Sequence, residues 1–170
     1  ASRNKEPSAS RNEKPIASSN KEPSASRNKE PSTPTHKALA AAQFSGRNAL
    51  RHIAAQVALG PRSPYHPRAK ARTLDYIEAH LKPLTTRIAR QPFVRHGLNG
   101  TNVWASIDGS DSDGAGRLML GAHWDTRPFA DRDANIDHRQ RPVLGANDGG
   151  SGVAVLLEVA RVLQKQPARS

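Results

Sequence analysis

The 170-residue sequence contains no cysteine, which excludes disulfides and thiolate metal sites within this chain. Any metal ion would therefore be held by His, Asp or Glu side chains. Long apolar runs are also missing. The two longest, residues 38–42 and 153–157, are far shorter than the roughly 20 residues of a membrane-spanning helix. No signal-peptide pattern is visible and the sequence begins with alanine, so we expect a processed or incomplete start.

Aromatic residues are scarce, with two Trp, two Tyr and three Phe. Acidic residues are outnumbered by basic ones, 15 against 26, which gives a formal net charge of +11. Such an excess permits a polyanionic partner. Few aromatic side chains are available to stack on bases, and no nucleic-acid-binding motif is present, so we expect no nucleic-acid partner. A basic, non-enzymatic binding protein stays an alternative, and its candidate contacts are Arg127, Arg132, Arg139 and Arg141.

The first 32 residues are four octapeptides, namely ASRNKEPS, ASRNEKPI, ASSNKEPS and ASRNKEPS. Ile16 is their only large apolar residue, so this segment buries too little surface to offset the entropy of ordering. We therefore predict a disordered tail over residues 1–35 and one folded domain over residues 36–170. The repeat is interpreted as a tandem duplication without a role, and a basic tether or a modifiable tail is the alternative.

Two helices are predicted from the spacing of apolar residues in the first part of the domain. In residues 46–59 and again in residues 69–81, apolar side chains recur every three or four positions. A turn rich in Gly and Pro separates the two segments, and Pro83 stops the second helix.

A third helix is predicted over residues 153–164. Its polar residues recur at intervals of three, which is typical of a narrow solvated stripe, and its other side chains are apolar enough to be buried against a sheet. The polar residues are Glu158, Arg161 and Gln164. We accordingly expect Glu158 to lie in the solvated stripe rather than to bind a metal.

Four strands are predicted, over residues 88–95, 101–107, 117–122 and 142–146. The segment DGSDSDGAG, residues 108–116, is typical of a hairpin loop or a similar tight connection, and its aspartates lack the order of a calcium-binding loop. The third strand is almost continuously apolar, as in a sheet covered on both faces. Strands and helices together predict a mixed α/β sheet with helices on both faces.

Side chains with metal-binding chemistry follow the last two predicted strands. In open α/β sheets, ligands bind beyond the carboxyl ends of the strands, where His123 and Asp148 would converge if the strands are neighbours. His123 and Asp125 point to the same side of an extended chain, so Asp125 would orient the imidazole and leave its other nitrogen for a metal. The alternatives are a satisfied core histidine at position 123 and a helix N-cap at Asp148.

The chain resembles the bacterial glutaminyl-peptide cyclotransferases (glutaminyl cyclases), of the superfamily of zinc-dependent aminopeptidases, in three segments: QVALGPRSPYHPRAK, LGAHWDTRPFADRD and PVLGANDGGSGVAVLLEVARVL. The resemblance covers residues 44–164. It implies a three-layer α/β/α sandwich with a mixed central sheet and a Zn²⁺ site over the strand ends. It also implies Asp148 as a zinc ligand, His123 as a conditional ligand and Asp125 as the supporting catalytic carboxylate.

The activity implied by this resemblance is conversion of N-terminal glutamine to pyroglutamate with release of ammonia, on peptide or protein N-termini. A zinc aminopeptidase of the same superfamily is the alternative. In the family, a glutamate general acid/base and further metal ligands lie beyond the position of Ser170, so we expect the chain to be the N-terminal half, an inactive fragment with an unpaired apolar sheet edge. The resemblance also implies an extracellular or periplasmic location, whereas the oligomeric state is not indicated.

Overall fold

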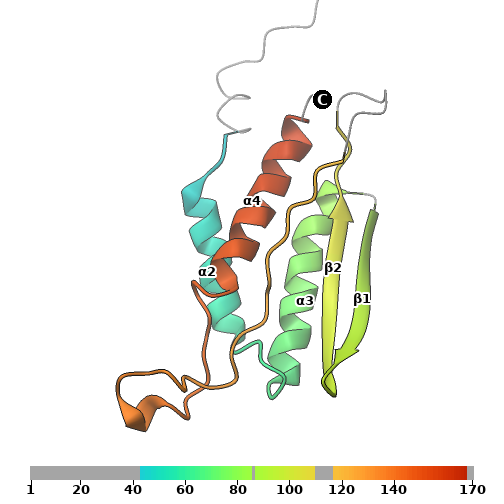
Figure 1. Cartoon of the computed structure of the whole chain (residues 1–170). Helices are drawn as coiled ribbons and strands as arrows, with labels where there is room; N and C mark the ends of the chain where they lie inside the picture. The colour runs from blue at the N-terminus through green and yellow to red at the C-terminus, as the bar shows by residue number, and fades with distance from the viewer. Residues whose placement is uncertain (1–42, 86, 110–116, 168–170) are drawn as a thin grey trace, which may run out of the picture. The chain divides into compact units, whose positions relative to one another are not determined.

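The computed structural model describes residues 43–85, 87–109 and 117–167 (Figure 1). The octapeptide repeat and most of the DGSDSDGAG segment lie outside these residues. The described chain is a mixed α/β structure, which confirms the predicted fold class. Its elements are α2 (Gly46–Leu59), α3 (Pro67–Leu81), η1 (Lys82–Leu84), β1 (Arg87–Arg95), β2 (Leu98–Ser106), η2 (Ile136–His138) and α4 (Gly150–Lys165).

All three long helices were predicted, with small differences at their ends. Helix α2 has the predicted bounds, and it begins after Ser45, whose hydroxyl accepts a hydrogen bond from the backbone N–H of Asn48. Helix α3 begins two residues before the predicted start, because Pro67 occupies its first position, where a fixed φ is favourable and no N–H is needed.

The helices pack on one another and on the sheet. Helix α4 packs mainly against α2 and also contacts α3, and α3 in turn contacts β2 (Figure 1). The core cluster consists of Ile77 from α3 and of Val153 and Leu157 from α4. Among the described residues, none of the helices has both the length and the apolar character that a membrane span requires.

Strands β1 and β2 form an antiparallel hairpin in which Arg95 pairs with Leu98. The two residues between them, His96 and Gly97, have φ values of 50° and 74°. Positive φ at both positions is the requirement of a type I′ hairpin turn. His96 and Gly97 therefore form the turn of this hairpin. Strand β2 begins at Leu98, three residues before the predicted start of the strand.

The other two predicted strands are absent from the described residues. Residues 117–122 and 142–146 contain no strand, and the side chains of Leu118 and Met119 are 85% and 93% exposed. The apolar character of residues 117–122 had favoured a strand buried on both faces of a sheet. A strand also needs a hydrogen-bonded neighbour, and in the described residues β1 and β2 pair with each other and with neither of these segments.

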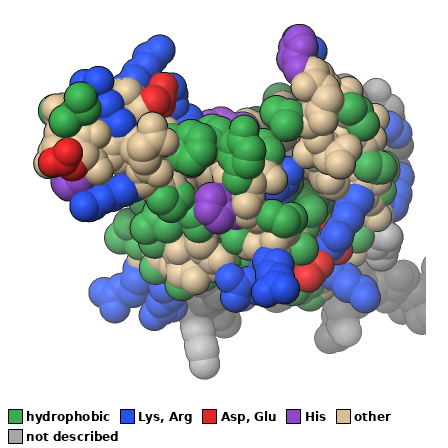
Figure 2. Space-filling model, turned by 90° about the horizontal axis from the view of Figure 1, so that it is seen from below, with side chains coloured by type: hydrophobic (Ala, Val, Ile, Leu, Met, Phe, Trp, Pro, Cys, Tyr) green, Lys and Arg blue, Asp and Glu red, His purple; other side chains and the backbone are tan. Residues whose placement is uncertain are grey.

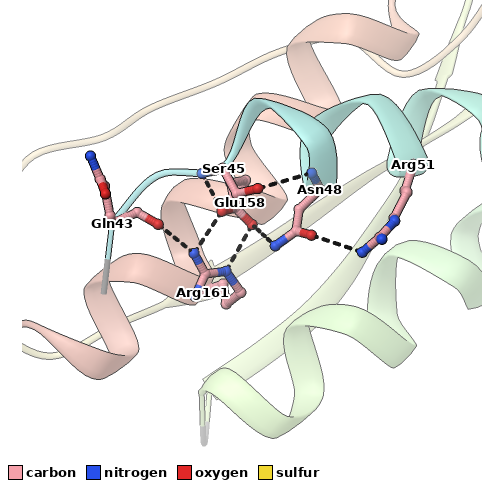
Figure 3. A network of polar contacts seen from close by, with 6 residues as sticks. All are labelled: Gln43, Ser45, Asn48, Arg51, Glu158 and Arg161. Carbon is pink, nitrogen blue, oxygen red and sulfur yellow. Dashed lines mark hydrogen bonds and ion pairs between the residues drawn. The ribbon is translucent and has the colours of Figure 1, made fainter. Parts of the chain in front are cut away.

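Glu158 is fully buried, so its predicted place in a solvated stripe was wrong. Its carboxylate accepts hydrogen bonds from the backbone N–H of Ser45 at 2.7 Å and from the Asn48 side chain at 3.4 Å (Figure 3). Arg161 donates two more, at 2.8 and 2.6 Å, and also binds the carbonyl of Gln43 at 2.8 Å. The periodicity of α4 did not reveal that the start of α2 covers this face.

The contacts of Glu158 also change its acidity. Hydrogen bonds from Arg161 are the largest cause that lowers the pKa of Glu158 below its ordinary value, and burial opposes them. The backbone N–H of Ser45 lowers this pKa further. The ionised carboxylate therefore connects the first turn of α2 to the middle of α4 (Figure 3).

Candidate metal centre

The structure brings together the three residues that the sequence singled out. The Nε2 atom of His123 lies 3.0 Å from Oδ1 of Asp148, and its Nδ1 atom lies 3.4 Å from Oδ1 of Asp125. One carboxylate therefore faces each ring nitrogen. The three side chains are 58%, 62% and 64% exposed for His123, Asp148 and Asp125, so the group is open to solvent.

Neither of the two alternative interpretations holds. An imidazole that is more than half exposed is not a satisfied core histidine. The N-cap of α4 is Gly149, and no side chain caps this helix end, so Asp148 is not an N-cap residue. The roles of His123, Asp125 and Asp148 at a metal are still predictions, but their side chains are free of these two structural tasks.

Two glycines allow the segments that carry these residues to approach each other closely. Gly149 has φ +87°, and a Cβ atom there would lie 2.7 Å from the carbonyl oxygen of Asp125 and 3.3 Å from the His123 ring. Gly145 has φ +61°, and a Cβ atom there would lie 2.3 Å from Cγ2 of Thr126. Only glycine combines these backbone conformations with such close contact. The side chains thus converge without the neighbouring strands that we predicted.

The sequence did not reveal Arg62, which is fully buried beside this group. Its Nε atom donates to the carbonyl of Trp124 at 2.8 Å, while Nη1 and Nη2 donate to the carbonyls of Leu144 at 2.5 Å and Gly145 at 2.6 Å. Its backbone N–H also donates to the hydroxyl of Thr126 at 3.0 Å. The only signal was its place in GPRSP, inside the first segment that carries the family resemblance.

The electrostatic surroundings of Arg62 link it to the candidate centre. Burial lowers the pKa of the Arg62 guanidinium below its ordinary value, and the negative charges of Asp125 and Asp148 oppose that effect. A buried charge costs several kcal/mol unless hydrogen bonds and opposite charges offset the loss of hydration. Three carbonyl oxygens and the two nearby carboxylates provide both kinds of compensation here.

The side chains of His123, Asp125 and Asp148 match part of a zinc site. Zn²⁺ binds imidazole nitrogen and carboxylate oxygen, and a catalytic zinc ordinarily has three protein ligands and an open position. His123 and Asp148 fit two of these ligand positions, and Asp125 fits the carboxylate that orients a ligating imidazole. Within the described ranges, no group of three or more His, Asp or Glu side chains is arranged to hold a metal ion on its own.

The loop between Thr126 and Gly145 contains the arginines of the alternative binding interpretation. It projects from the rest of the described chain and carries acidic side chains among its basic ones (Figures 1 and 2). Arg127 forms an ion pair with Asp131 at 2.8 Å, and Arg139 donates to the carbonyl of Asp133 at 2.9 Å. Two of the four candidate arginines thus have partners within the loop, which weakens the interpretation as a polyanion-binding surface.

The mixed α/β fold of the described chain is similar to that of zinc-dependent peptidases and their relatives. Residues 102–170, which include all three site residues, match Peptidase family M28. A curated relative, a probable zinc metalloprotease from Leptosphaeria maculans, is 31% identical over 106 residues, which are 62% of this chain and 22% of the relative.

Solved structures of bacterial enzymes are similar to most of the described chain. A Zn-dependent exopeptidase from Parabacteroides distasonis is 36% identical with a TM-score of 0.63, over 73% of this chain and 43% of that structure. The glutaminyl cyclase of Porphyromonas gingivalis is also 36% identical, with a TM-score of 0.64, over 75% and 44%. The glutaminyl cyclase of Tannerella forsythia is 35% identical, with a TM-score of 0.64, over 73% and 43%.

These comparisons confirm the family resemblance that was inferred from the sequence. They include glutaminyl cyclases as well as exopeptidases, so they support the zinc peptidase superfamily without separating the two activities. The chain spans less than half the length of the solved structures it matches and about a fifth of the curated relative.

Proposed function

We propose that this chain contributes part of the zinc centre of a glutaminyl-peptide cyclotransferase, with His123 and Asp148 as ligands and Asp125 as the carboxylate that orients His123. The observation that supports this most is the placement of the His123 ring between the two carboxylates. Similarity to two glutaminyl cyclases, at 35–36% identity, also supports this proposal. Peptide or protein N-termini would be the substrates, in an extracellular or periplasmic location.

The reaction joins two ends of one N-terminal glutamine. The nitrogen of the α-amine forms a bond to the side-chain amide carbon, the bond from that carbon to the amide nitrogen breaks, and ammonia leaves with a proton that the amine gives up. Zinc, when bound, supplies Lewis-acid polarisation of the amide carbonyl. His123 and Asp148 would hold the ion, and Asp125 would keep the imidazole in one orientation and tautomer. The proton relay needs a further general acid/base, which the resemblance places beyond the part that this chain matches.

Aminopeptidase activity is the second candidate. It is favoured by the match to Peptidase family M28 and by a likeness to a leucine aminopeptidase precursor from Bacteroides thetaiotaomicron, at 35% identity and a TM-score of 0.63. That structure is covered to 43%. In this case the same three residues would serve metal-assisted hydrolysis of the first peptide bond.

A fusion protein separates the two activities. Residues 36–170 are joined to the part of the P. gingivalis glutaminyl cyclase that this chain does not match, and the folded fusion is loaded with zinc. Ammonia release from a peptide with N-terminal glutamine supports the cyclotransferase, and release of free leucine from a leucyl peptide supports the aminopeptidase. Asp148→Asn is expected to abolish the activity, whereas His138→Ala is expected to leave it unchanged. A folded, zinc-loaded fusion with neither activity would contradict both proposals.

A further inference from the structure

Arg62 joins the two loops that carry the candidate metal ligands. Trp124, whose carbonyl accepts from Nε, stands directly between His123 and Asp125 in the sequence. Gly145, whose carbonyl accepts from Nη2, lies in the GANDGG segment that ends on Asp148 and the two glycines after it. One buried side chain therefore binds the backbone on both sides of the His123–Asp148 pair.

The geometry of the guanidinium group suits this task. Its planar fork donates in fixed directions, and here three different nitrogen atoms reach three carbonyls that belong to two separate loops. A lysine ammonium keeps the charge but is a point donor on a flexible stem, so it does not reproduce the three directions. Hydrogen bonds from a charged donor are stronger than those between neutral groups, so three of them hold exposed loops in one arrangement.

The backbone of Arg62 adds a second connection to the same loop. Its N–H donates to the Thr126 hydroxyl, and its carbonyl accepts from the Thr126 N–H at 3.4 Å. Both Arg62 and Thr126 are buried, with at most 4% of the residue exposed. The segment between α2 and α3 therefore contacts the His123 loop through the main chain of Arg62. The Arg62 side chain contacts both loops.

We propose that Arg62 is a positioning residue that sets the separation of His123 and Asp148 by holding their two loops through backbone carbonyls. Its importance for a metal centre rests on the proposed function. The positioning of the two loops does not rest on that function, because the His123 imidazole and the Asp148 carboxylate face each other without a metal ion. Both consequences are measurable without an activity assay.

Two readouts on the full chain test the proposal. The first is the ¹⁵N chemical shifts of the His123 ring without metal at a fixed pH, which report the surroundings of both ring nitrogens. The second is the affinity for Co²⁺, followed by its visible absorption. Arg62→Lys is expected to move the ring shifts towards those of an unpaired, solvent-exposed histidine. It is also expected to lower Co²⁺ affinity by about 10- to 100-fold, the usual effect of losing a group that orients metal ligands.

Two matched controls separate positioning from general stability. Arg72 also donates from its guanidinium to a backbone carbonyl, that of Leu59 at 2.7 Å, but in an exposed place between α2 and α3. Leu74→Ala weakens the packing of α3, and Leu74 does not belong to the core cluster against which Trp124 packs. Arg72→Lys and Leu74→Ala, measured below its unfolding temperature, are both expected to keep the ring shifts and the Co²⁺ affinity of the unchanged chain.

Thr126→Val provides a second test if Arg62→Lys does not fold. It removes the acceptor of the Arg62 N–H at nearly constant volume, and a smaller shift in the same direction is expected. Ring shifts that are unchanged in a folded Arg62→Lys or Thr126→Val protein would overturn the proposal, as would an equal change in Leu74→Ala. If the ring shifts depend on Arg62 while the Co²⁺ affinity of Arg62→Lys equals that of the unchanged chain, the positioning role is supported and its link to the proposed zinc centre is contradicted.

Discussion

Gly149 lies so close to Asp125 that a Cβ atom on the glycine would be 2.7 Å from the aspartate's carbonyl oxygen. This contact joins the N-cap of α4 to the loop of His123. It also explains why a Gly-rich segment precedes α4, because a side chain at this position would force the two loops apart. The arrangement of the candidate metal centre therefore depends on the absence of a side chain as much as on the three residues that carry the chemistry.

Gly149→Ala is expected to lower the free energy of unfolding by about 1–3 kcal/mol, because the new side chain clashes and its φ of +87° is strained. Thermal or urea unfolding measures the change. Gly46→Ala is the matched control, since a Cβ atom at Gly46 meets nothing within 4 Å. An alanine in the first turn of α2 is expected to leave stability unchanged or to raise it slightly. Equal effects at the two positions would contradict the close approach of the loops.

Glu158→Gln is expected to lower the free energy of unfolding by about 1–3 kcal/mol near neutral pH, because a buried carboxylate loses its charge-assisted hydrogen bonds. Arg161 lowers the pKa of Glu158 in the folded protein below the ordinary value of 4.5. The stabilisation is therefore present above about pH 4.5 and is lost as the pH falls through the folded pKa. Urea unfolding between about pH 6 and about pH 3 should show the difference between the two proteins shrinking towards low pH.

The control for Glu158 is Glu78, which forms an exposed ion pair with Arg90. Glu78→Gln is expected to change the free energy of unfolding by less than about 1 kcal/mol at any of these pH values, because water screens the pair. A pH-independent effect of Glu158→Gln, or one no larger than that of Glu78→Gln, would show that the ionised carboxylate does not hold α2 against α4.

His96→Asn is expected to raise the free energy of unfolding by up to about 1 kcal/mol, because Asn tolerates the left-handed backbone conformation that His96 adopts at φ 50°. The unfolding temperature measured by circular dichroism checks this. The same substitution at His138, whose φ is not positive, is expected to have little effect. A lower unfolding temperature for His96→Asn would mean that the histidine side chain contributes something that the turn geometry does not require.

Helices were predictable because their signal is local. Apolar spacing and a following turn located α2 and α3 to within two residues, since a helix satisfies its hydrogen bonds within its own segment. The hairpin turn was less accessible, because His96 and Gly97 are not the Asn-Gly pair that usually indicates a type I′ turn. Residues 117–122 had the composition of a buried strand, but strand formation depends on a neighbouring strand that composition does not reveal.

The three residues of the candidate site were predictable from their residue types and their order in the sequence. His123, Asp125 and Asp148 were selected from the ends of apolar segments and from a family motif, and the structure places them together. Arg62 and Glu158 were missed because their burial depends on partners far away in the sequence, such as Gly145 and Ser45. A single charged residue in a sequence is usually exposed, and its burial becomes visible only with the fold.

The central claim is that His123 and Asp148 share a divalent cation, and zinc titration calorimetry on the chain tests it most directly. We expect His123→Ala and Asp148→Asn each to weaken Zn²⁺ binding at least about tenfold, because each removes one ligand. His138→Ala, which alters another histidine that faces an aspartate, at 3.8 Å from Asp133, is expected to bind Zn²⁺ like the unchanged chain. Equal zinc affinity in all four proteins would contradict the account.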